Sequence, residues 1–254
     1  MMFAGIDMGI ENTKVVIISD DKIIGRSKVS TGGIDRPVQA QKAYDEALRA
    51  AGIDASNIDK VVATGKGKYD IPFADDRITE TVAAAHAARF LCPEATSVMS
   101  VGAYETIAAT LGRERFINEF SLNQKCAAGL GAFLKRLARR FDMSMETVGA
   151  AEGPDAGLLN DGCVVFSELD AISLINNGAT PEAVMMSAVM AAAVRAAGVL
   201  NDLTIPSNDC VVLIGGLAKN AAFVKGLEKS LGLKFLIPDD AEYGGAIGAA
   251  KCAC

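Results

Sequence analysis

The Cys-x-x-Cys pairs typical of metal sites are missing from this chain of 254 residues. Their absence among its six cysteines excludes the ligand runs of zinc fingers and ferredoxins. Tryptophan is absent, and histidine occurs once, as His86. A lone histidine on a helix face is more often structural than catalytic. Any site with several cysteine ligands therefore has to combine distant parts of the sequence or two chains.

Basic runs and long apolar runs are also lacking. The net charge is −6 at pH 7, so nothing attracts nucleic acid or an anionic membrane, and small molecules and proteins remain as partners. The most apolar window, residues 184–200, is short and contains Arg195, which predicts a buried helix rather than a membrane span. The first residues lead directly into an apolar run without a small-residue cleavage site, so we expect no signal peptide. A cytoplasmic protein is expected, with thiols or ligands rather than disulfides.

The order of apolar and glycine-rich segments predicts an α/β protein made of two related halves. Its length suits one large domain or two of about 100–150 residues. The pattern of an opening β-meander restarts near Pro93, which divides the chain into domains 1–92 and 93–254. Whether the terminal helix packs back on the first domain is left open. The expected strands cover residues 3–9, 14–18, 22–29, 61–67, 97–103, 106–111 and 210–214, and residues 61–67 end in a glycine loop. The expected helices cover 38–51, 78–91, 181–200 and 243–251, and another follows residue 220.

Two cysteines, Cys126 and Cys163, each precede a run of apolar residues with helical spacing. We therefore expect both thiols near helix N-termini, where free N–H groups and the helix dipole stabilise a thiolate. They are 37 residues apart, and two thiols cannot fill a tetrahedral site, so a four-cysteine cluster would need two chains. The alternative is that each is a small buried hydrophobe, as isolated intracellular cysteines usually are. Core positions are expected for Cys92 and Cys210. Cys252 and Cys254 are expected in a frayed tail, with metal binding as the alternative.

Glycines follow several of the predicted strands, and glycine lets a backbone turn approach phosphate oxygens closely. Asp7 and Gly9 close the first strand and suit the phosphates and a metal, whereas Gly215 and Gly216 suit the adenosine side. A single Gly-Gly pair is more often only a tight turn. The ordered set of turns indicates a nucleotide site.

Five motifs occur in an order that is typical of one protein family. They are residues 7–9 with Thr13 and Lys14, residues 123–131 around Cys126, residues 163–168, residues 213–220 and residues 243–250. Together they resemble the BadF/BadG/BcrA/BcrD ATPase family, which includes the activators of 2-hydroxyacyl-CoA dehydratases and the ATP-hydrolysing subunits of benzoyl-CoA reductase. The resemblance covers nearly the whole chain, and the two cysteine motifs are its most specific part.

The resemblance implies an actin-like or sugar-kinase-like fold of two ribonuclease-H-like domains, with ATP and Mg²⁺ in the cleft between them. It also implies a dimer of like subunits, identical or different, that shares one [4Fe–4S] cluster, and Cys126 and Cys163 match the family's cluster ligands. With ATP hydrolysis, electrons from a ferredoxin or flavodoxin would pass to a benzoyl-CoA reductase or 2-hydroxyacyl-CoA dehydratase partner. Asp7 and Glu105 would be catalytic. The nucleotide-binding residues would be Gly9, Asn12, Thr13, Lys14, Gly102, Ala103, Gly215, Gly216, Lys219 and Asn220.

Both phosphate turns depart from the family pattern. Ile10 and Glu11 replace a pair that bears hydroxyls, and Glu11 would repel phosphate unless its carboxylate points away or binds a metal. Ser100 stands in place of a carboxylate, and Tyr104 in place of a glutamine that would orient water. A small-molecule kinase of the same fold and a nucleotide-binding subunit with little ATPase activity are therefore kept as alternatives. The kinase is disfavoured because it would leave the cysteine motifs without a purpose.

Overall fold

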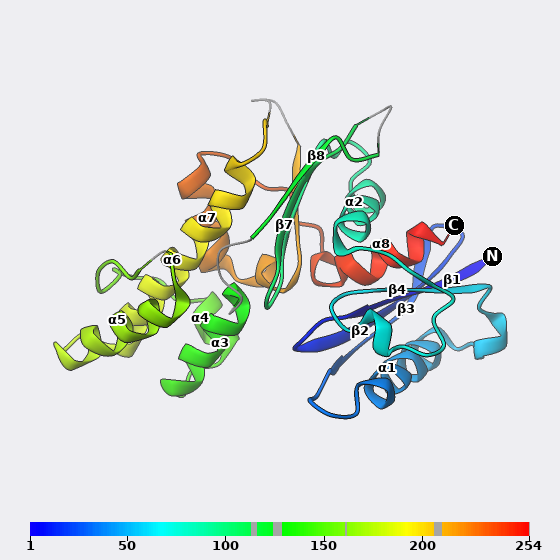
Figure 1. Ribbon diagram of the computed structural model, residues 1–254, viewed down its shortest axis with the longest axis horizontal. Coiled ribbons are helices and arrows are strands. Elements are labelled where there is room, and N and C mark those ends of the chain that lie inside the picture. The colour runs from blue at the N-terminus through cyan, green and yellow to red at the C-terminus, as the bar shows by residue number, and fades with distance from the viewer. Residues whose placement is uncertain (113–115, 124–128, 161, 206–209, 254) are drawn as a thin grey trace.

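Two sheets of mixed strand direction form the framework of the computed structural model, which describes residues 1–112, 116–123, 129–160, 162–205 and 210–253 (Figure 1). The strands are β1 (Met2–Met8), β2 (Asn12–Ser19), β3 (Lys22–Ser30), β4 (Lys60–Thr64), β5 (Asp76–Arg77), β6 (Ser97–Val101), β7 (Thr106–Thr110), β8 (Glu119–Leu122) and β9 (Val211–Ile214). The first sheet has the order β3-β2-β1-β4-β5 and the second the order β8-β7-β6-β9. In both sheets a strand pairs antiparallel with its successor and parallel with a later strand: β1 with β2 and β4, and β6 with β7 and β9. The strand pattern that was predicted to restart near Pro93 does so at β6, which begins at Ser97, while the domain boundary between residues 92 and 93 stays a prediction.

Helices cover both faces of the first sheet. They are α1 (Arg36–Ala51) and α8 (Gly244–Cys252). Each helix packs on one face of the sheet, and β2 contributes to the hydrophobic cores on both faces because successive side chains of a strand point to opposite sides. Val15 and Ile17 pack with α1, whereas Val16 and Ile18 pack on the side of α8. Figure 1 shows α1 and α8 on either side of the blue strands. The terminal helix thus lies on the sheet that the first residues of the chain build.

Close backbone contacts hold α8 in place between β1 and α2 (Glu80–Leu91). A Cβ atom added at Gly5 in β1 would lie 1.9 Å from the carbonyl oxygen of Ala246. A Cβ atom added at Gly248 would lie 1.7 Å from the carbonyl oxygen of Ala83 in α2. Both distances are far below van der Waals contact, so only glycine allows the three elements to pack this closely.

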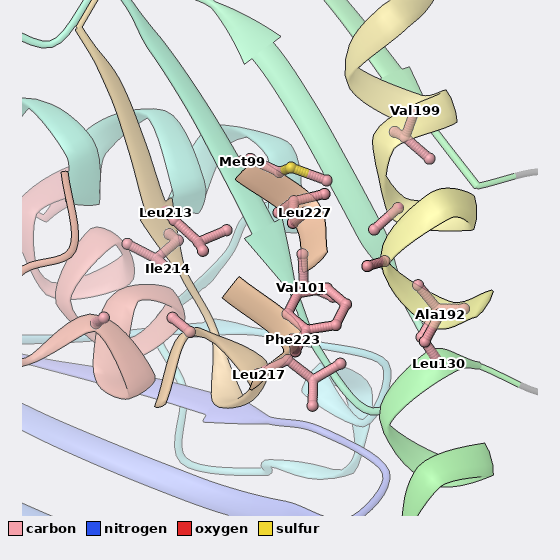
Figure 2. Close-up of a cluster of buried hydrophobic side chains, with 14 of the residues drawn as sticks. Met99, Val101, Leu130, Ala192, Val199, Leu213, Ile214, Leu217, Phe223 and Leu227 are labelled. Atoms are coloured by element: carbon pink, nitrogen blue, oxygen red, sulfur yellow. The ribbon is translucent and has the colours of Figure 1, made fainter. Parts of the chain in front are cut away.

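The second sheet lies between α2 on one face and a pair of long helices on the other. The pair is α6 (Pro181–Asn201), which contacts β7 and β8, and α7 (Ala221–Leu231). Figure 2 shows Phe223 and Leu227 of α7 beside Val101 and Met99 of β6. Phe223 is fully buried there, next to Val101 and Leu217. Among the described residues, only α6 is long and apolar enough to span a membrane, and 67% of its most apolar window is buried inside the protein. This agrees with the predicted core helix.

Three further helices pack against α6 or α7: α3 (Leu130–Arg140), α4 (Met145–Gly149) and α5 (Val164–Asn176). The helices predicted after the two cysteine motifs are therefore present. Three of the apolar residues that predicted α5, namely Phe166, Leu169 and Ile172, are exposed, however. The helix joins the core through its other side, where Val164 and Ala171 are buried and Leu174 is partly buried. Short 3₁₀ helices complete the fold: η1 (Ala55–Asn57), η2 (Lys68–Asp70), η3 (Gly216–Lys219) and η4 (Ala241–Tyr243).

Candidate functional site

A cavity of about 920 Å³ lies between the two sheets. The turns that follow β1, β4, β6 and β9 all contribute to its wall, through Gly9, Gly65, Gly102 and Gly215. The cavity therefore collects the glycine turns of both sheets at one place, as the sequence predicts for a nucleotide site.

The first turn is fixed by hydrogen bonds of its own backbone. Gly9 donates its N–H to the carbonyl oxygen of Asn12 (3.0 Å), and its carbonyl oxygen accepts from the hydroxyl of Thr31 (2.8 Å). Thr13 does not line the cavity. Its side chain is buried, and its hydroxyl lies 3.0 Å from the hydroxyl of Thr31. The structure thus gives Thr13 a position that supports the turn, while Gly9 and Asn12 line the cavity.

Asp7 lies at the base of the cavity, near the end of β1 and two residues before Gly9. A Cβ atom added at Gly65 or at Gly245 would lie 2.7 Å from one of its carboxylate oxygens, so two glycines make room for this side chain. Burial raises the pKa of Asp7; Lys14 opposes this effect, and Glu80 and Glu105 add to it. A carboxylate in this setting can take up a proton or bind a divalent cation.

Lysines from β2, β3 and η3 face the same cavity. Lys14 lies opposite Asp7 in the β1–β2 pairing, and burial lowers its pKa although Asp7 and Glu242 oppose this effect. Lys28 on β3 and Lys219 on η3 both bind the carboxylate of Glu242. Three ammonium groups around a cavity with glycine turns suit a chain of phosphates.

The second turn carries Glu105. Gly102 donates its N–H to the carbonyl oxygen of Glu105 (2.9 Å), and Lys66 binds the Glu105 carboxylate (2.6 Å). Burial lowers the pKa of Lys66, but the hydrogen bonds and charges of Glu105 and Glu80 outweigh it and raise the pKa overall. Lys66 and Glu80 were missed from the sequence, although Lys66 belongs to the predicted glycine loop 65–67.

Cys163 lies apart from this cavity. It is the N-cap residue of α5 and is partly exposed. The side chain of Asn160 accepts its N–H at 2.7 Å, which fixes the backbone at the helix start. Cys126 lies outside the described residues, and the part of the chain that is described contains no group of three or more candidate metal ligands.

The two cysteines expected in the core meet each other. The sulfur atoms of Cys92 and Cys210 are 3.6 Å apart, and burial together with Cys210 raises the pKa of Cys92 to about 12. A thiol with so high a pKa is a poor ligand and nucleophile at neutral pH. This pair therefore agrees with the structural role predicted for it.

Most of the predicted nucleotide-site residues are brought together by the fold. Thr13 is the exception, because it is buried beside the cavity. The cavity wall includes Asp7, Gly9, Asn12, Lys14, Gly102, Ala103, Glu105, Gly215, Gly216, Lys219 and Asn220. The assignment of roles to these residues remains a prediction.

Two sheets of repeated topology, with glycine turns facing a shared cleft, define an α/β fold of the actin-like and sugar-kinase-like ATPase class. The chain belongs to the BadF/BadG/BcrA/BcrD ATPase family, whose sequence model matches residues 4–253. The resemblance inferred from the motifs is therefore confirmed.

Relatives in this family include proteins of both expected branches. The activator of lactoyl-CoA dehydratase from Anaerotignum propionicum is 31% identical over 98% of this chain and 96% of its own length. A benzoyl-CoA reductase subunit from Thauera aromatica is 29% identical over 97% of this chain and 91% of its own length. The activator of the 2-hydroxyisocaproyl-CoA dehydratase from Clostridium difficile, solved with bound ADPNP, has a TM-score of 0.89 and 25% identity, covering 100% of this chain and 94% of that one.

Proposed function

We propose that this protein is an ATP-dependent electron-transfer component that works as a dimer of like subunits with a shared [4Fe–4S] cluster. It would take electrons from a ferredoxin or flavodoxin and deliver them at low potential to a benzoyl-CoA reductase or a 2-hydroxyacyl-CoA dehydratase. The observation that carries the proposal is the position of Cys163, which begins α5 next to an exposed apolar face of the same helix. Names of relatives in both branches support the choice of partner.

The cleft supplies the groups that an ATPase needs. ATP would lie along the glycine turns, with its phosphates near Lys14 and Lys219. Asp7 would hold Mg²⁺ at the base of the cavity, because its carboxylate is enclosed by glycines and open to the cleft. Glu105, which Lys66 fixes in the second turn, would orient the attacking water. A related activator binds the ATP analogue ADPNP, which supports this use of the cleft.

Cys163 fits the role of a cluster ligand. Its side chain makes no capping hydrogen bond, and it is partly exposed at the start of α5. Cys126, outside the described residues, would be the second ligand, and a second subunit would complete the four-cysteine set. The cluster would supply one-electron chemistry at low potential.

The exposed face of α5 favours a second copy of the chain as the partner that completes this set. Val165, Phe166, Leu169 and Ile172 are 62%, 57%, 55% and 42% exposed. Large apolar side chains grouped at helical spacing are typical of a contact surface rather than of a solvated helix. Because the group starts next to Cys163, a second copy packed on it would bring two copies of Cys163 into one interface.

A short series of contacts connects the cleft with Cys163. The start of α3 packs on the second phosphate turn, where Ala132 donates its N–H to the carbonyl oxygen of Ala103 (2.9 Å). Further along α3, Arg136 donates to the Glu168 carboxylate of α5 at 3.1 and 2.9 Å. A shift of the second turn can therefore reach α5 through a single helix.

The proposal is tested by the iron and sulfide content and the electron paramagnetic resonance spectrum of protein purified without oxygen. About two irons per chain in a dimer are expected, and they should be lost in Cys126→Ser and in Cys163→Ser. Cys252→Ser is the matched control and should keep its iron. Iron-free wild-type protein, or normal ATP-dependent electron transfer in Cys126→Ser, would contradict the proposal.

The second turn favours one alternative, a nucleotide-binding subunit with little ATPase activity. Tyr104 lines the cavity next to Glu105, at the place where a glutamine is expected to orient water. Tight ATP binding without ATP hydrolysis in the assembled complex would establish this alternative. Hydrolysis that requires Glu105 would exclude it.

A further inference from the structure

Helix α3 contacts both phosphate turns of the cleft. Its first contact is a backbone contact with the second turn, where a Cβ atom at Gly131 would lie 2.9 Å from the carbonyl oxygen of Gly102. Its second contact is made by a side chain and crosses the cleft to the first turn. There the Lys135 ammonium group binds the carboxylate of Glu11.

The ion pair between Lys135 and Glu11 lies in the wall of the cavity, and both residues are part of its lining. Their side chains are 36% and 29% exposed, so solutes that enter the cleft can reach them. Glu11 follows Gly9 by two residues and therefore belongs to the turn that faces the phosphates. The pairing also supplies a partner for Glu11, whose carboxylate was expected to repel phosphate.

We propose that Lys135 binds the terminal phosphate of ATP, and that Glu11 holds the Lys135 ammonium group when this phosphate is missing. The proposal rests on the proposed function only in that this cleft binds ATP. A phosphate group carries more charge and more acceptor oxygens than a carboxylate, so it competes well for an ammonium group. Lysine suits the exchange because its charge sits at the end of a flexible stem.

The exchange gives the cleft a way to distinguish ATP from ADP. With ADP the terminal phosphate is absent, and α3 stays attached to the first turn through Glu11. With ATP the same lysine attaches α3 to the nucleotide. Arg136 of α3 also binds Glu168 of α5, the helix that begins at Cys163. The ATP-bound and ADP-bound states therefore differ in whether α3, which contacts α5, is held by the nucleotide or by Glu11.

A purely structural ion pair would behave differently. In that case Glu11 and Lys135 would matter only to each other, and removing either charge would have the same small effect. Under the proposal the two charges act on ATP with opposite sign, since Lys135 attracts the phosphate and Glu11 competes with it.

The test is calorimetric measurement of Mg²⁺-ATP and Mg²⁺-ADP dissociation constants on the full-length protein. Lys135→Gln should weaken ATP binding about tenfold and change ADP binding less than about twofold, whereas Glu11→Gln should tighten ATP binding about threefold. Arg139→Gln is the matched control, because it removes one positive charge from an exposed position of α3, and it should change neither constant. Lys135→Met, which keeps most of the apolar stem, should repeat the result of Lys135→Gln.

Two results would overturn the proposal: weaker ATP binding in both Glu11→Gln and Lys135→Gln, or equal losses of ATP and ADP affinity in the Lys135 variants. The measurement needs neither a cluster nor an electron acceptor. Failure of the proposed electron transfer would therefore appear in the iron content and leave the ratio of ATP to ADP affinity unchanged.

Discussion

Lys28 on the first sheet donates to the carboxylate of Glu242 at 2.9 Å, across the cleft that separates the two sheets. Lys219 binds the other oxygen of the same carboxylate from the opposite wall. Glu242 is almost fully buried, so one carboxylate joins a strand of the first sheet to the turn after β9. This three-residue network fixes the distance between two walls of the cleft at one end.

Replacing Glu242 by Gln should lower the free energy of unfolding at pH 7 by about 1–2 kcal/mol, since two lysines lose a buried counter-charge. Burial raises the pKa of Glu242, but the hydrogen bonds from Lys219 and Lys28 outweigh it, and the pKa lies below its ordinary value of 4.5. A lowered pKa means that the stabilisation is present above pH 4.5 and is lost as the pH falls through the folded-state pKa. Urea denaturation at several pH values should therefore show the difference between the two proteins shrinking in acid. Glu152→Gln, at an exposed ion pair, is the control and should show no such trend.

Gly131→Ala should lower the free energy of unfolding by about 1–3 kcal/mol, because the added methyl group meets the backbone of the second phosphate turn. Gly198→Ala in α6 is the matched control. A Cβ atom there meets nothing within 4 Å, so this change should raise stability by about 0.5–1 kcal/mol. Thermal or chemical denaturation measures both, and equal stability of the two variants would contradict the close contact.

Asp7→Asn should reduce ATP hydrolysis by about 10²-fold or more without lowering the stability of the nucleotide-free protein at pH 7. Burial raises the pKa of Asp7, so the folded protein binds this proton more tightly than the unfolded chain does. Ionisation therefore costs stability as the pH rises above 3.8, and an uncharged amide avoids that cost. Steady-state ATPase assays check the loss of hydrolysis, and denaturation curves check that stability is not lowered. Asp45→Asn, exposed on α1, should leave both unchanged, and full activity in Asp7→Asn would remove Asp7 from the mechanism.

Glu105→Gln should lower kcat for ATP hydrolysis by about 10–100-fold and leave KM within about threefold. The amide keeps the size of the side chain but loses the charge that binds Lys66 and that would orient water. Kinetics at saturating and limiting ATP separate the two constants. A higher KM with unchanged kcat would make Glu105 a binding residue instead, and Glu94→Gln provides an exposed control.

If this protein carries the proposed cluster, Glu168→Gln should make protein purified without oxygen lose iron to a chelator several-fold faster than the wild type. The carboxylate binds Arg136 and Arg140, and these contacts hold α3 beside α5, whose N-cap is Cys163. Absorbance decay of the iron–sulfur chromophore would follow the loss. Glu182→Gln in the exposed first turn of α6 is the control, and equal rates for all three proteins would show that this ion pair does not support the cluster.

The meander of the first sheet was predictable because its first two strands are short apolar runs and a pair of aspartates marks the turn before the third. Asp20 and Asp21 both adopt positive φ, 46° and 60°, which suits the tight hairpin between β2 and β3. Strand β8 was missed because its four residues are partly exposed at a sheet edge and carry no alternation. Helix α4 was missed because five residues are too few to show a period.

The nucleotide site was predictable as a set of turns but not as a set of contacts. Thr13 belongs to the first motif, yet its hydroxyl pairs with Thr31 instead of facing the cavity. The partner of Glu11 lies 124 residues further along the chain, and no local pattern connects it to Lys135. Apolar spacing likewise predicted α5 without indicating that its apolar face is exposed, because periodicity shows which residues share a face and not what covers that face.

The packing of α8 against β1 and α2 also affects when the first sheet can fold during translation. During synthesis the first sheet leaves the ribosome long before the helix that covers one of its faces, and Val16 and Ile18 on that face meet water until then. The first strands therefore cannot reach their final stability until almost the whole chain has been translated. A ribosome-bound chain that stops before residue 244 should be digested readily by protease in this sheet, and one that includes α8 should resist.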